Sequence, residues 1–408
     1  NNVIRGAVQL YWGSKTGSAF ITGQILVYPG TDASALFGES IAYLGDTNGD
    51  GYSDLAVGAQ HSDATGIDTG IVYIYLGSKE GVVDPPARTL NFPGTQNLAY
   101  FGSNVSAAGD VNQDGYQDLL ISAKRANLKG SVFLYLGGPT GIQSTPHKVF
   151  AAPGTNDFGS FGFLVQNVGD LNHDGWEDLA MTALVANSSL IQPGGVFIYY
   201  GSASGFSSTP TKSIFYPGVV QNAFFGYAMA AGDLNADTFN DLVVSAPYED
   251  KIYAFYGSSV GLPSVPSLVI SNPGGDVNAY FGSSLKIAEA TGDNRADVVL
   301  TAYGSLAENS AGGVIYVLEG SSQGIGPTPK QVSIYPHSDD TSFFGYAMDF
   351  VGDCNADGRN DFVVSAFSAD AQGGDRGVLY HYQLSNNRLE LQTQVVPPWT
   401  TGNFFFGR

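Results

Sequence analysis

The sequence predicts an all-β fold, a seven-bladed β-propeller built from four-stranded antiparallel blades. Three observations carry the prediction: a repeated Phe-Gly dipeptide, a repeated order of short β-prone segments, and 54 glycines and 19 prolines that supply turns between them. Successive Phe-Gly copies lie 56 to 64 residues apart, which indicates one supersecondary unit repeated along the chain. The copies begin at Phe37, Phe101, Phe161, Phe225, Phe281, Phe344 and Phe406.

Each of the first six copies is followed by an acidic stretch and then by an apolar run typical of a buried strand. These runs occupy residues 54–59, 118–123, 178–183, 241–246, 297–302 and 361–366. An alternating segment such as 70–78 follows, and a fourth short segment, which usually ends in Pro-Gly, completes the unit. Glycine-rich first segments such as 225–233 suit strands that crowd a central channel, which favours a propeller over a solenoid of sheets.

The two ends of the chain supply parts of a seventh blade. A third-strand segment, 6–14, and a fourth-strand segment, 21–30, precede the first Phe-Gly copy, while residues 404–408 begin another unit. Joining them would close the ring without an exposed sheet edge, so we expect a single propeller domain over residues 1–408. Because this blade has no second strand in the sequence, either the blade is incomplete or the chain is a piece of a longer one.

Acidic residues outnumber basic ones in this chain. The 37 Asp and Glu against 17 Lys and Arg give a formal charge of −20, which opposes binding to nucleic acid and favours a cation. No uninterrupted apolar run is long enough to span a bilayer, and the first residues lack a signal-peptide pattern, so we expect no membrane insertion. Cys354 is the only cysteine, which excludes an intrachain disulfide.

The acidic stretch between the first and second strand segments has the composition of a calcium site. In the first copy, Asp46, Asn48, Asp50 and Asp54 place side-chain oxygens at positions one, three, five and nine, and Tyr52 at position seven offers its backbone carbonyl. Glycine at position six allows the sharp bend. Oxygen-only ligands at this spacing favour Ca²⁺, whereas zinc would require His or Cys. A bound cation would also relieve the repulsion between crowded carboxylates.

Five loops keep this set, so we expect about five Ca²⁺ ions in a structural role. The expected ligands of the other four are Asp110, Asn112, Asp114, Tyr116 and Asp118; Asp170, Asn172, Asp174, Trp176 and Asp178; Asp233, Asn235, Asp237, Phe239 and Asp241; and Asp353, Asn355, Asp357, Arg359 and Asp361. Position twelve lies in a β-prone run instead of at a helix start, which separates these loops from EF-hands.

Two of the acidic loops depart from the pattern. Thr238 replaces the glycine of the fourth loop, and because a β-branched residue resists positive φ, we expect a weaker or distorted site there. The fifth unit is interpreted as having lost four residues between Asp293 and Asp297, so we expect no calcium in it.

Nothing in the sequence indicates catalysis. Two G-x-S-x-G matches, around Ser259 and Ser322, fall where other units place the turn between third and fourth strands, and a nucleophile elbow needs a strand-to-helix turn. Cys354, at position two of its loop, is interpreted as a small neutral side chain. The histidines are interpreted as surface or loop residues without metal-ligand spacing: His61, His147, His173, His337 and His381.

The order Phe-Gly, then Gly-Asp-x-Asn-x-Asp-Gly, then Asp-Leu and an alanine resembles the FG-GAP repeats of the integrin α-subunit propeller. Ser245-Ala246-Pro247 is the nearest match to the third element, and the resemblance covers nearly the whole chain. It implies a seven-bladed propeller with calcium loops on the lower face and a ligand face opposite, built from the loops that join strands two to three and four to one. Integrin propellers usually carry disulfides and calcium only in later blades, so this chain departs on both points.

We therefore expect an extracellular or cell-surface module, stabilised by calcium, that binds a protein or mediates adhesion. Affinities of about 10⁻⁴ to 10⁻³ M, typical of extracellular modules, would leave such loops empty in the cytosol. A carbohydrate-binding lectin and the accessory domain of a secreted hydrolase stay open as alternatives.

Two features of the expected ligand face are candidates for contact with a partner. A basic cluster, which is otherwise a solvated loop, consists of Lys124, Arg125 and Lys129. Aromatic residues, which either pack between blades or stack on sugars, stand directly before four Phe-Gly copies: Tyr100, Phe224, Tyr280 and Phe343.

Overall fold

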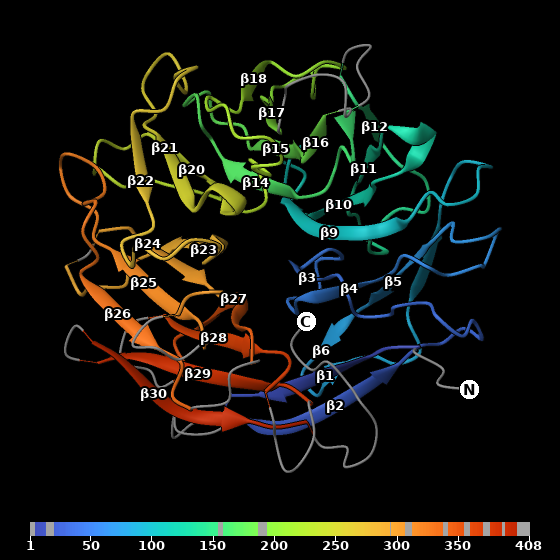
Figure 1. Cartoon of the computed structure of the whole chain (residues 1–408). Coiled ribbons are helices and arrows are strands. Elements are labelled where there is room, and N and C mark those ends of the chain that lie inside the picture. Colours follow the sequence, from blue (N-terminus) through green and yellow to red (C-terminus); the bar gives the residue numbers. More distant parts are fainter. Residues whose placement is uncertain are drawn as a thin grey trace. The chain divides into compact units, whose positions relative to one another are not determined.

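The structure is a computed structural model of the chain (Figure 1). It describes residues 5–13, 20–153, 158–186, 194–293, 295–306, 312–337, 342–354, 360–369, 376–385 and 388–397. These residues form 30 strands and two short 3-10 turns, η1 (Ala126–Leu128) and η2 (Pro247–Glu249). Among them, no helix has the length and apolar character needed to cross a membrane.

The chain divides into two compact units. The first consists of Asn1–Tyr11 and Thr22–Gln221, and the second of Trp12–Ile21 and Asn222–Arg408. Each unit holds three four-stranded antiparallel sheets whose strands lie side by side in chain order.

In the first unit, the four-stranded sheets have strands of four to nine residues, drawn from blue to green in Figure 1. Sheet one contains β3 (Ile41–Gly45), β4 (Asp54–Ala59), β5 (Ile71–Tyr75) and β8 (Arg88–Asn91); sheet two, β9 (Phe101–Gly109), β10 (Asp118–Ala123), β11 (Ser131–Tyr135) and β12 (Lys148–Ala151); and sheet three, β14 (Val165–Gly169), β15 (Asp178–Ala183), β17 (Gly195–Tyr199) and β18 (Lys212–Phe215). Two-stranded sheets pair β1 (Ala7–Trp12) with β2 (Ile21–Val27), β6 (Gly77–Ser78) with β7 (Gly81–Val82), and β13 (Phe158–Gly159) with β16 (Val185–Ala186).

The second unit repeats the arrangement, from yellow to red in Figure 1. Sheet four contains β19 (Met229–Gly232), β20 (Asp241–Ala246), β21 (Lys251–Phe255) and β22 (Leu268–Ser271); sheet five, β23 (Phe281–Ala288), β24 (Asp297–Ala302), β25 (Val314–Leu318) and β26 (Gln331–Ile334); and sheet six, β27 (Phe344–Gly352), β28 (Asp361–Ala366), β29 (Val378–Ser385) and β30 (Arg388–Val395).

The second strand of each sheet lies at the centre of the packing. All six residues of β4 and of β10 are buried, because neighbouring layers cover both faces of these strands. Consecutive sheets within a unit share a core: Leu44 and Ile74 of sheet one pack in one cluster with Phe101 and Ile121 of sheet two. Apolar burial between sheets, at about 25 cal/mol per Å², is the main stabilising contribution of this arrangement.

The Phe-Gly dipeptide is explained by this packing. Phe101 is fully buried and its ring lies 5.6 Å from that of Phe133, edge to face. Gly102 follows with a φ of +82°, and a Cβ there would lie 2.8 Å from Cγ2 of Val72 in sheet one. A left-handed backbone and the close approach of the neighbouring sheet both require glycine.

The prediction of an all-β fold of four-stranded antiparallel sheets is confirmed, and these sheets fit the blades of a β-propeller. The six predicted second strands coincide with β4, β10, β15, β20, β24 and β28. The segments expected as strands at 6–14 and 21–30 pair as β1 and β2. Residues 404–408 lie outside the described residues.

Candidate functional site

Six acidic loops join the first strand of a four-stranded sheet to the second. They are called loops one to six and span residues 46–54, 110–118, 170–178, 233–241, 289–297 and 353–361. In the first unit, neighbouring loops touch: the Gln117 N–H donates to the Asp46 carbonyl at 3.0 Å, and Nε2 of Gln113 donates to the Gly175 carbonyl at 2.7 Å. Loops one to three therefore lie at the same end of their sheets.

The aspartate at position one organises the loop backbone. In loop one, Oδ2 of Asp46 accepts the N–H of Gly51 at 2.7 Å, and Oδ1 accepts the N–H of Gly49 at 2.6 Å. Burial alone would raise the pKa of Asp46, but the backbone N–H groups of residues 51, 49, 48 and 50 together lower it. The carboxylate is consequently ionised at neutral pH.

Positions three and five contribute further oxygens in the same turn. Oδ1 of Asn48 accepts the N–H of Asp50 at 3.0 Å, and Oδ1 of Asp50 accepts the N–H of Tyr52 at 2.9 Å. The Asn48 amide nitrogen donates to Oδ2 of Asp50 at 2.9 Å. The same three contacts recur in loops two, three and four, at distances between 2.9 and 3.2 Å.

The aspartate at position nine is fully buried and ties the loop to the rest of its sheet. Oδ2 of Asp118 accepts the N–H of Val111 at 2.9 Å, and Oδ1 accepts the N–H of Gly137 at 2.8 Å, in the turn between β11 and β12. The corresponding bonds in loops one, three, four and five measure 2.7 to 3.1 Å. The aspartate at position nine therefore has a structural role, holding two backbone segments, in addition to the predicted role as a calcium ligand.

Burial raises the pKa of these position-nine carboxyls above that of an ordinary aspartate. Loss of solvation raises the pKa of Asp118 and of Asp178 to about 7 and that of Asp241 to about 6, and the neighbouring carboxylates at positions five and one raise it further. The backbone N–H bonds oppose the shift only in part. Without a cation, the negative charge at this position is costly, which is the electrostatic condition that a divalent ion would relieve.

Loops one to four thus bring the predicted side chains at positions one, three and five into one hydrogen-bonded turn, and the position-nine carboxyl is buried at the end of the same loop. The oxygen-only donor set fits a hard cation such as Ca²⁺. In loop six, Asp353 and Asp361 are described, whereas Asn355, Asp357 and Arg359 lie outside the described residues. Metal binding by these loops stays a prediction.

Loop four keeps its geometry despite the missing glycine. Thr238 adopts a φ of +79°, and its N–H donates to Oδ2 of Asp233 at 2.8 Å, as Gly51 does in loop one. A β-branched residue at positive φ is strained, so the loop is formed at a conformational cost.

The interpretation of the fifth unit as shortened is wrong. Asp297 pairs with Ala288 at the end of β23, and the Ala290 N–H donates to Oδ2 of Asp297 at 2.8 Å, as at position two of the other loops. Loop five therefore has full length, with Glu289 at position one. Oε1 of Glu289 accepts the N–H of Gly292 at 2.6 Å. The substitution of Glu for Asp concealed the alignment.

The interpretation of every histidine as a surface or loop residue is also wrong for His381. This residue lies in β29 with only 2 % of its side chain exposed. Its neighbours are Asp361 and Cys354, at positions nine and two of loop six. Spacing along the sequence does not reveal this cluster, because it depends on the register in which β29 pairs with β28.

The opposite end of the sheets carries the basic cluster. In an antiparallel sheet, the loops joining strands two to three and four to one lie away from the loops joining strands one to two. There the Arg125 guanidinium carbon lies 5.5 Å and the Lys124 Nζ 5.8 Å from the ring centre of Tyr100. The His61 ring lies 4.9 Å from the same tyrosine. The side chains of Lys124, Arg125 and His61 therefore gather around the ring of Tyr100, where the two cations can interact with its π-system.

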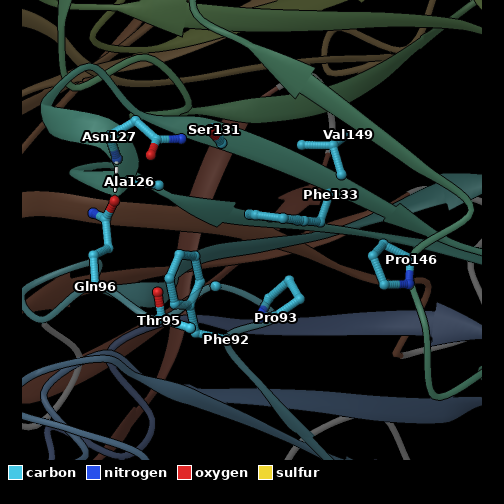
Figure 2. Close-up of a pocket in the computed structure, with 11 residues that line it drawn as sticks. Phe92, Pro93, Thr95, Gln96, Ala126, Asn127, Ser131, Phe133, Pro146 and Val149 are labelled. Atoms are coloured by element: carbon cyan, nitrogen blue, oxygen red, sulfur yellow. Dashed lines mark hydrogen bonds between the residues drawn. The ribbon is translucent and has the colours of Figure 1, made fainter.

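A pocket of about 470 Å³ lies beside this cluster (Figure 2). Phe92, Pro93 and Gln96 line it from the connection between sheets one and two, and Asn127 and Phe133 line it from sheet two. The Asn127 N–H donates to Oε1 of Gln96 at 2.7 Å, which fixes the two loops against each other. The pocket combines an aromatic floor with amide groups at its rim.

The aromatic residues before Phe-Gly form a chain of ring contacts in the second unit. Tyr248 contacts Phe224 at 4.5 Å and Tyr280 at 5.1 Å, Tyr280 stacks on Tyr303 at 4.7 Å, and Phe343 stacks on Phe367 at 5.0 Å, between ring centres. These contacts connect sheets four to six through their connecting loops. Packing between sheets is therefore one role of these residues. Exposed fractions of 50 % for Tyr248 and 41 % for Phe343 leave ring surface accessible.

The two serine motifs lie in turns, as predicted. The Ser258 hydroxyl donates to the Gly261 carbonyl at 3.0 Å, and the Ser321 hydroxyl to the Gly324 carbonyl at 2.7 Å. The elements that follow are strands β22 and β26, whereas a nucleophile elbow leads into a helix.

Comparison with known proteins places these observations in a family context. The family model described as FG-GAP repeat matches residues 37–75, 101–135 and 225–261. The chain thus carries FG-GAP repeats, as the sequence resemblance predicted.

Curated relatives that the chain resembles include integrin alpha-subunits. The chain is 33 % identical over 237 residues to integrin alpha-5 of Xenopus laevis, covering 55 % of this chain and 21 % of that protein. It is 33 % identical over 165 residues to integrin alpha-IIb of Homo sapiens, covering 39 % and 16 %. The match therefore spans about a fifth or less of the length of these relatives.

A solved structure with a similar fold is a putative 6-phosphogluconolactonase from Bacteroides uniformis. The TM-score is 0.52 at 10 % sequence identity, over 91 % of this chain and 89 % of that chain. At this identity the likeness concerns the fold alone.

Proposed function

We propose that the chain is a calcium-stabilised binding module, a single seven-bladed propeller domain over residues 1–408 that recognises a protein ligand in an extracellular or cell-surface setting. The supporting observation is the repeated loop in which an ionised position-one carboxylate and a position-five carboxylate hold one tight turn, and a buried position-nine carboxylate accepts an N–H from the start of the same loop. Kinship with integrin alpha-subunits over the FG-GAP repeats supports the binding role.

Calcium in this proposal is held in loops one to four and six and has no catalytic role. Carboxylate oxygens at positions one, five and nine, the amide oxygen at position three and the carbonyl at position seven would hold it. The cation would neutralise the buried position-nine charge and so join the loop to the turn between strands three and four. In loop five, carboxylate oxygens of Glu289, Asp293 and Asp297 lie within 4.8 Å of one another. We nevertheless propose that this loop binds no calcium, because the guanidinium of Arg295, 3.5 Å from Oδ2 of Asp293, already supplies a positive charge there.

The seventh blade is proposed to form from both ends of the chain. β1 and β2 correspond to the third and fourth strands of the repeat, and Phe406-Gly407 repeats the motif that opens each first strand. Such a closure would leave no sheet edge free for pairing with other chains. Deletion of residues 398–408 should then lower the melting temperature, and an unchanged melting temperature would contradict the closure.

The Tyr100 cluster is proposed as the ligand contact, and its chemistry fits an acidic side chain. Arg125 and Lys124 are the cations held on the Tyr100 ring, on a chain with a net charge of −20. A displayed peptide library, panned on the full chain in millimolar calcium, tests this directly. We expect peptides with a central Asp or Glu to be enriched, and the enrichment to fall about tenfold with Arg125→Ala, which corresponds to about 1.4 kcal/mol.

Lys79→Ala is the matched control. Lys79 is exposed and lies in the β6–β7 turn, next to the Gly77 that binds Asp54, and so belongs to the acidic-loop end. This variant should bind like the wild type. Equal loss in both variants, or no enrichment of acidic peptides, would overturn the assignment of the ligand end.

A glycan is a second candidate ligand, favoured by the exposed rings of Tyr248 and Phe343. Stacking on sugars would use these ring faces. A glycan array probed with the full chain, and with Tyr248→Ala as the comparison, separates the two candidates. Binding of more than one sugar per chain that falls with Tyr248→Ala supports a lectin.

No catalytic step is part of the proposal. The serine motifs lie in turns that lead into strands. The likeness in fold to the putative 6-phosphogluconolactonase, at 10 % identity, carries no activity to this chain.

A further inference from the structure

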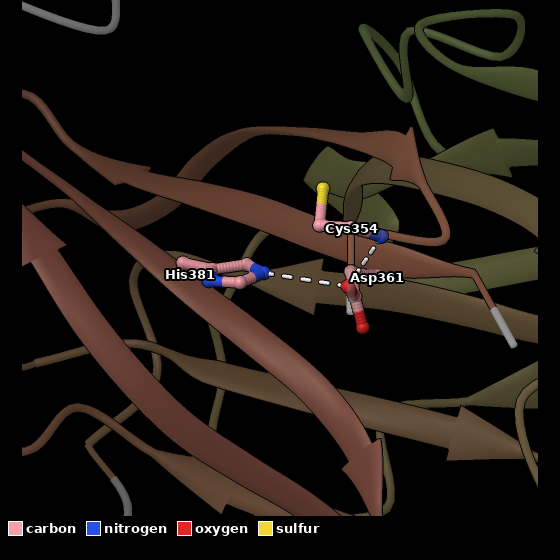
Figure 3. A group of neighbouring side chains, drawn as sticks. All are labelled: Cys354, Asp361 and His381. Carbon is pink, nitrogen blue, oxygen red and sulfur yellow. Dashed lines mark hydrogen bonds and ion pairs between the residues drawn. The ribbon is translucent and has the colours of Figure 1, made fainter. Parts of the chain in front are cut away.

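Loop six differs from the other acidic loops in the chemistry of the side chains around its buried aspartate. Asp361 has two neighbours of a different kind, the thiol of Cys354 and the imidazole of His381, and the three ligand atoms lie within 4.8 Å of one another. Figure 3 shows the imidazole pointing towards Asp361, with Cys354 beside it. All three residues belong to the second unit.

The repeat shows that both neighbours are exceptions. His381 pairs with Val363, and the residue at this place in the other five sheets is a buried aliphatic: Ile74, Leu134, Ile198, Ala254 and Val317. Cys354 stands at position two, where the other five loops carry Thr47, Val111, Leu171, Leu234 and Ala290. Packing therefore requires neither a thiol nor an imidazole at these places.

The histidine is buried without adequate hydrogen-bond partners. Nδ1 and Nε2 of His381 both lack a partner at hydrogen-bond distance, and Nε2 lies 3.7 Å from Oδ2 of Asp361. That separation is too long for a hydrogen bond. Leaving buried polar atoms without partners is unfavourable, so this state requires an explanation. A buried imidazole nitrogen of this kind is a common ligand of metal ions.

We propose that Cys354, His381 and Asp361 form a binding site for a divalent transition-metal ion of the zinc class, which shares Asp361 with the oxygen ligands proposed for calcium in loop six and competes with calcium for that carboxylate. Thiolate, imidazole and carboxylate are the three protein ligands that such ions prefer, and three ligands with an open fourth position are a common set. Calcium, which takes six to eight oxygens, does not suit this set.

Binding would require a small contraction of the cluster. Metal–ligand distances of about 2.0 to 2.3 Å place tetrahedral ligand atoms about 3.5 Å apart, so the widest separation must shorten by about 1 Å. Rotation of the half-buried Cys354 side chain supplies this movement, at the loss of its 3.5 Å contact with the Val351 carbonyl. The metal displaces the thiol proton to solvent, and no bond between protein atoms changes.

Cobalt(II) is the probe, because a bound thiolate gives it a charge-transfer absorption band. The full chain, reduced and in millimolar calcium, is titrated with Co²⁺ and then with Zn²⁺. We expect one equivalent of Co²⁺ with a thiolate band that Zn²⁺ removes. The repeat itself supplies the variants: Cys354→Thr copies loop one, and His381→Ile copies sheet one. Cys354→Thr should abolish the band, and His381→Ile should weaken binding at least tenfold.

His147→Gln is the control, since His147 is an exposed histidine of the first unit, directly before β12, and its substitution should leave the titration unchanged. Calcium-dependent melting confirms that each variant is folded, which separates this test from that of the calcium loops. Absence of the band in folded wild-type protein would overturn the proposal. So would a titration that neither Cys354→Thr nor His381→Ile alters.

Discussion

The carboxylate of Asp118 accepts the N–H of Gly137 at 2.8 Å and joins an acidic loop to the turn between β11 and β12 of the same sheet. A second bond, from the N–H of Val111 at 2.9 Å, holds the loop's own start. Backbone groups seven residues before and 19 residues after Asp118 thus depend on one buried side chain. The same relationship recurs in loops one, three, four and five.

Asp118→Ala should destabilise the protein by about 2 to 4 kcal/mol, because it leaves two buried N–H groups without acceptors. Urea unfolding in millimolar calcium measures the change. Asp349→Ala is the control: Asp349 is 67 % exposed, its ion pair with Lys286 is on the surface, and the expected loss is below about 1 kcal/mol. Equal losses for the two variants would contradict the structural role of position nine.

Calcium-free protein should become more stable as the pH falls from about 8 to 5. The pKa of Asp118 and Asp178 in the folded state, about 7, lies above the ordinary value of 3.8, so the folded protein binds more protons in this window and its stability declines as pH rises. Carboxyls with lowered pKa, such as Asp46 and Asp276, lose their contribution only below the ordinary value. Urea midpoints at pH 5.5 and 7.5 test the sign, and a higher midpoint at pH 7.5 would refute it.

Much of this arrangement could be predicted from the sequence. The second strands were found at their observed bounds because strands buried on both faces appear as continuous apolar runs. The Phe-Gly copies marked the units because a buried ring and a left-handed glycine tolerate few substitutions.

Other features could not be predicted from local spacing. The full length of loop five could not be predicted from the aspartate pattern, because Glu289 occupies position one in place of aspartate. The number of residues between position one and Asp297 is the same as in the other loops. The burial of His381 could not be predicted from its position in the sequence, because its neighbours belong to another strand and to a loop. Aligning the third strands with one another would have revealed a histidine in a row of aliphatic residues.

Thr238→Gly should stabilise the protein by about 1 kcal/mol and strengthen calcium binding in loop four, because it removes the strain of a threonine at a φ of +79°. The reciprocal change, Gly115→Ala in loop two, should cost about 1 kcal/mol, since φ is +91° there and no neighbouring atom obstructs the added methyl group. Urea unfolding of both variants gives the comparison. A destabilised Thr238→Gly protein would show that the threonine makes a compensating contact.

Calcium counting separates loop five from the others. We expect five ions per chain by mass spectrometry of the native protein, and Asp293→Asn in loop five should leave the count unchanged because Arg295 already balances that carboxylate. Asp114→Asn, at the same position in loop two, should reduce the count by one. A sixth ion that disappears with Asp293→Asn would place calcium in loop five as well.

Thermal unfolding with and without calcium tests the central claim most directly. Sites of about 10⁻⁴ to 10⁻³ M affinity contribute about 1.4 to 2.7 kcal/mol each in 10 mM calcium, which for five sites in a chain of this size corresponds to a shift on the order of 10 °C. The loops are predicted to hold the sheets together through calcium, so the melting temperature should fall by about this amount when calcium is removed. A melting temperature that is the same in calcium and in chelator would contradict the claim.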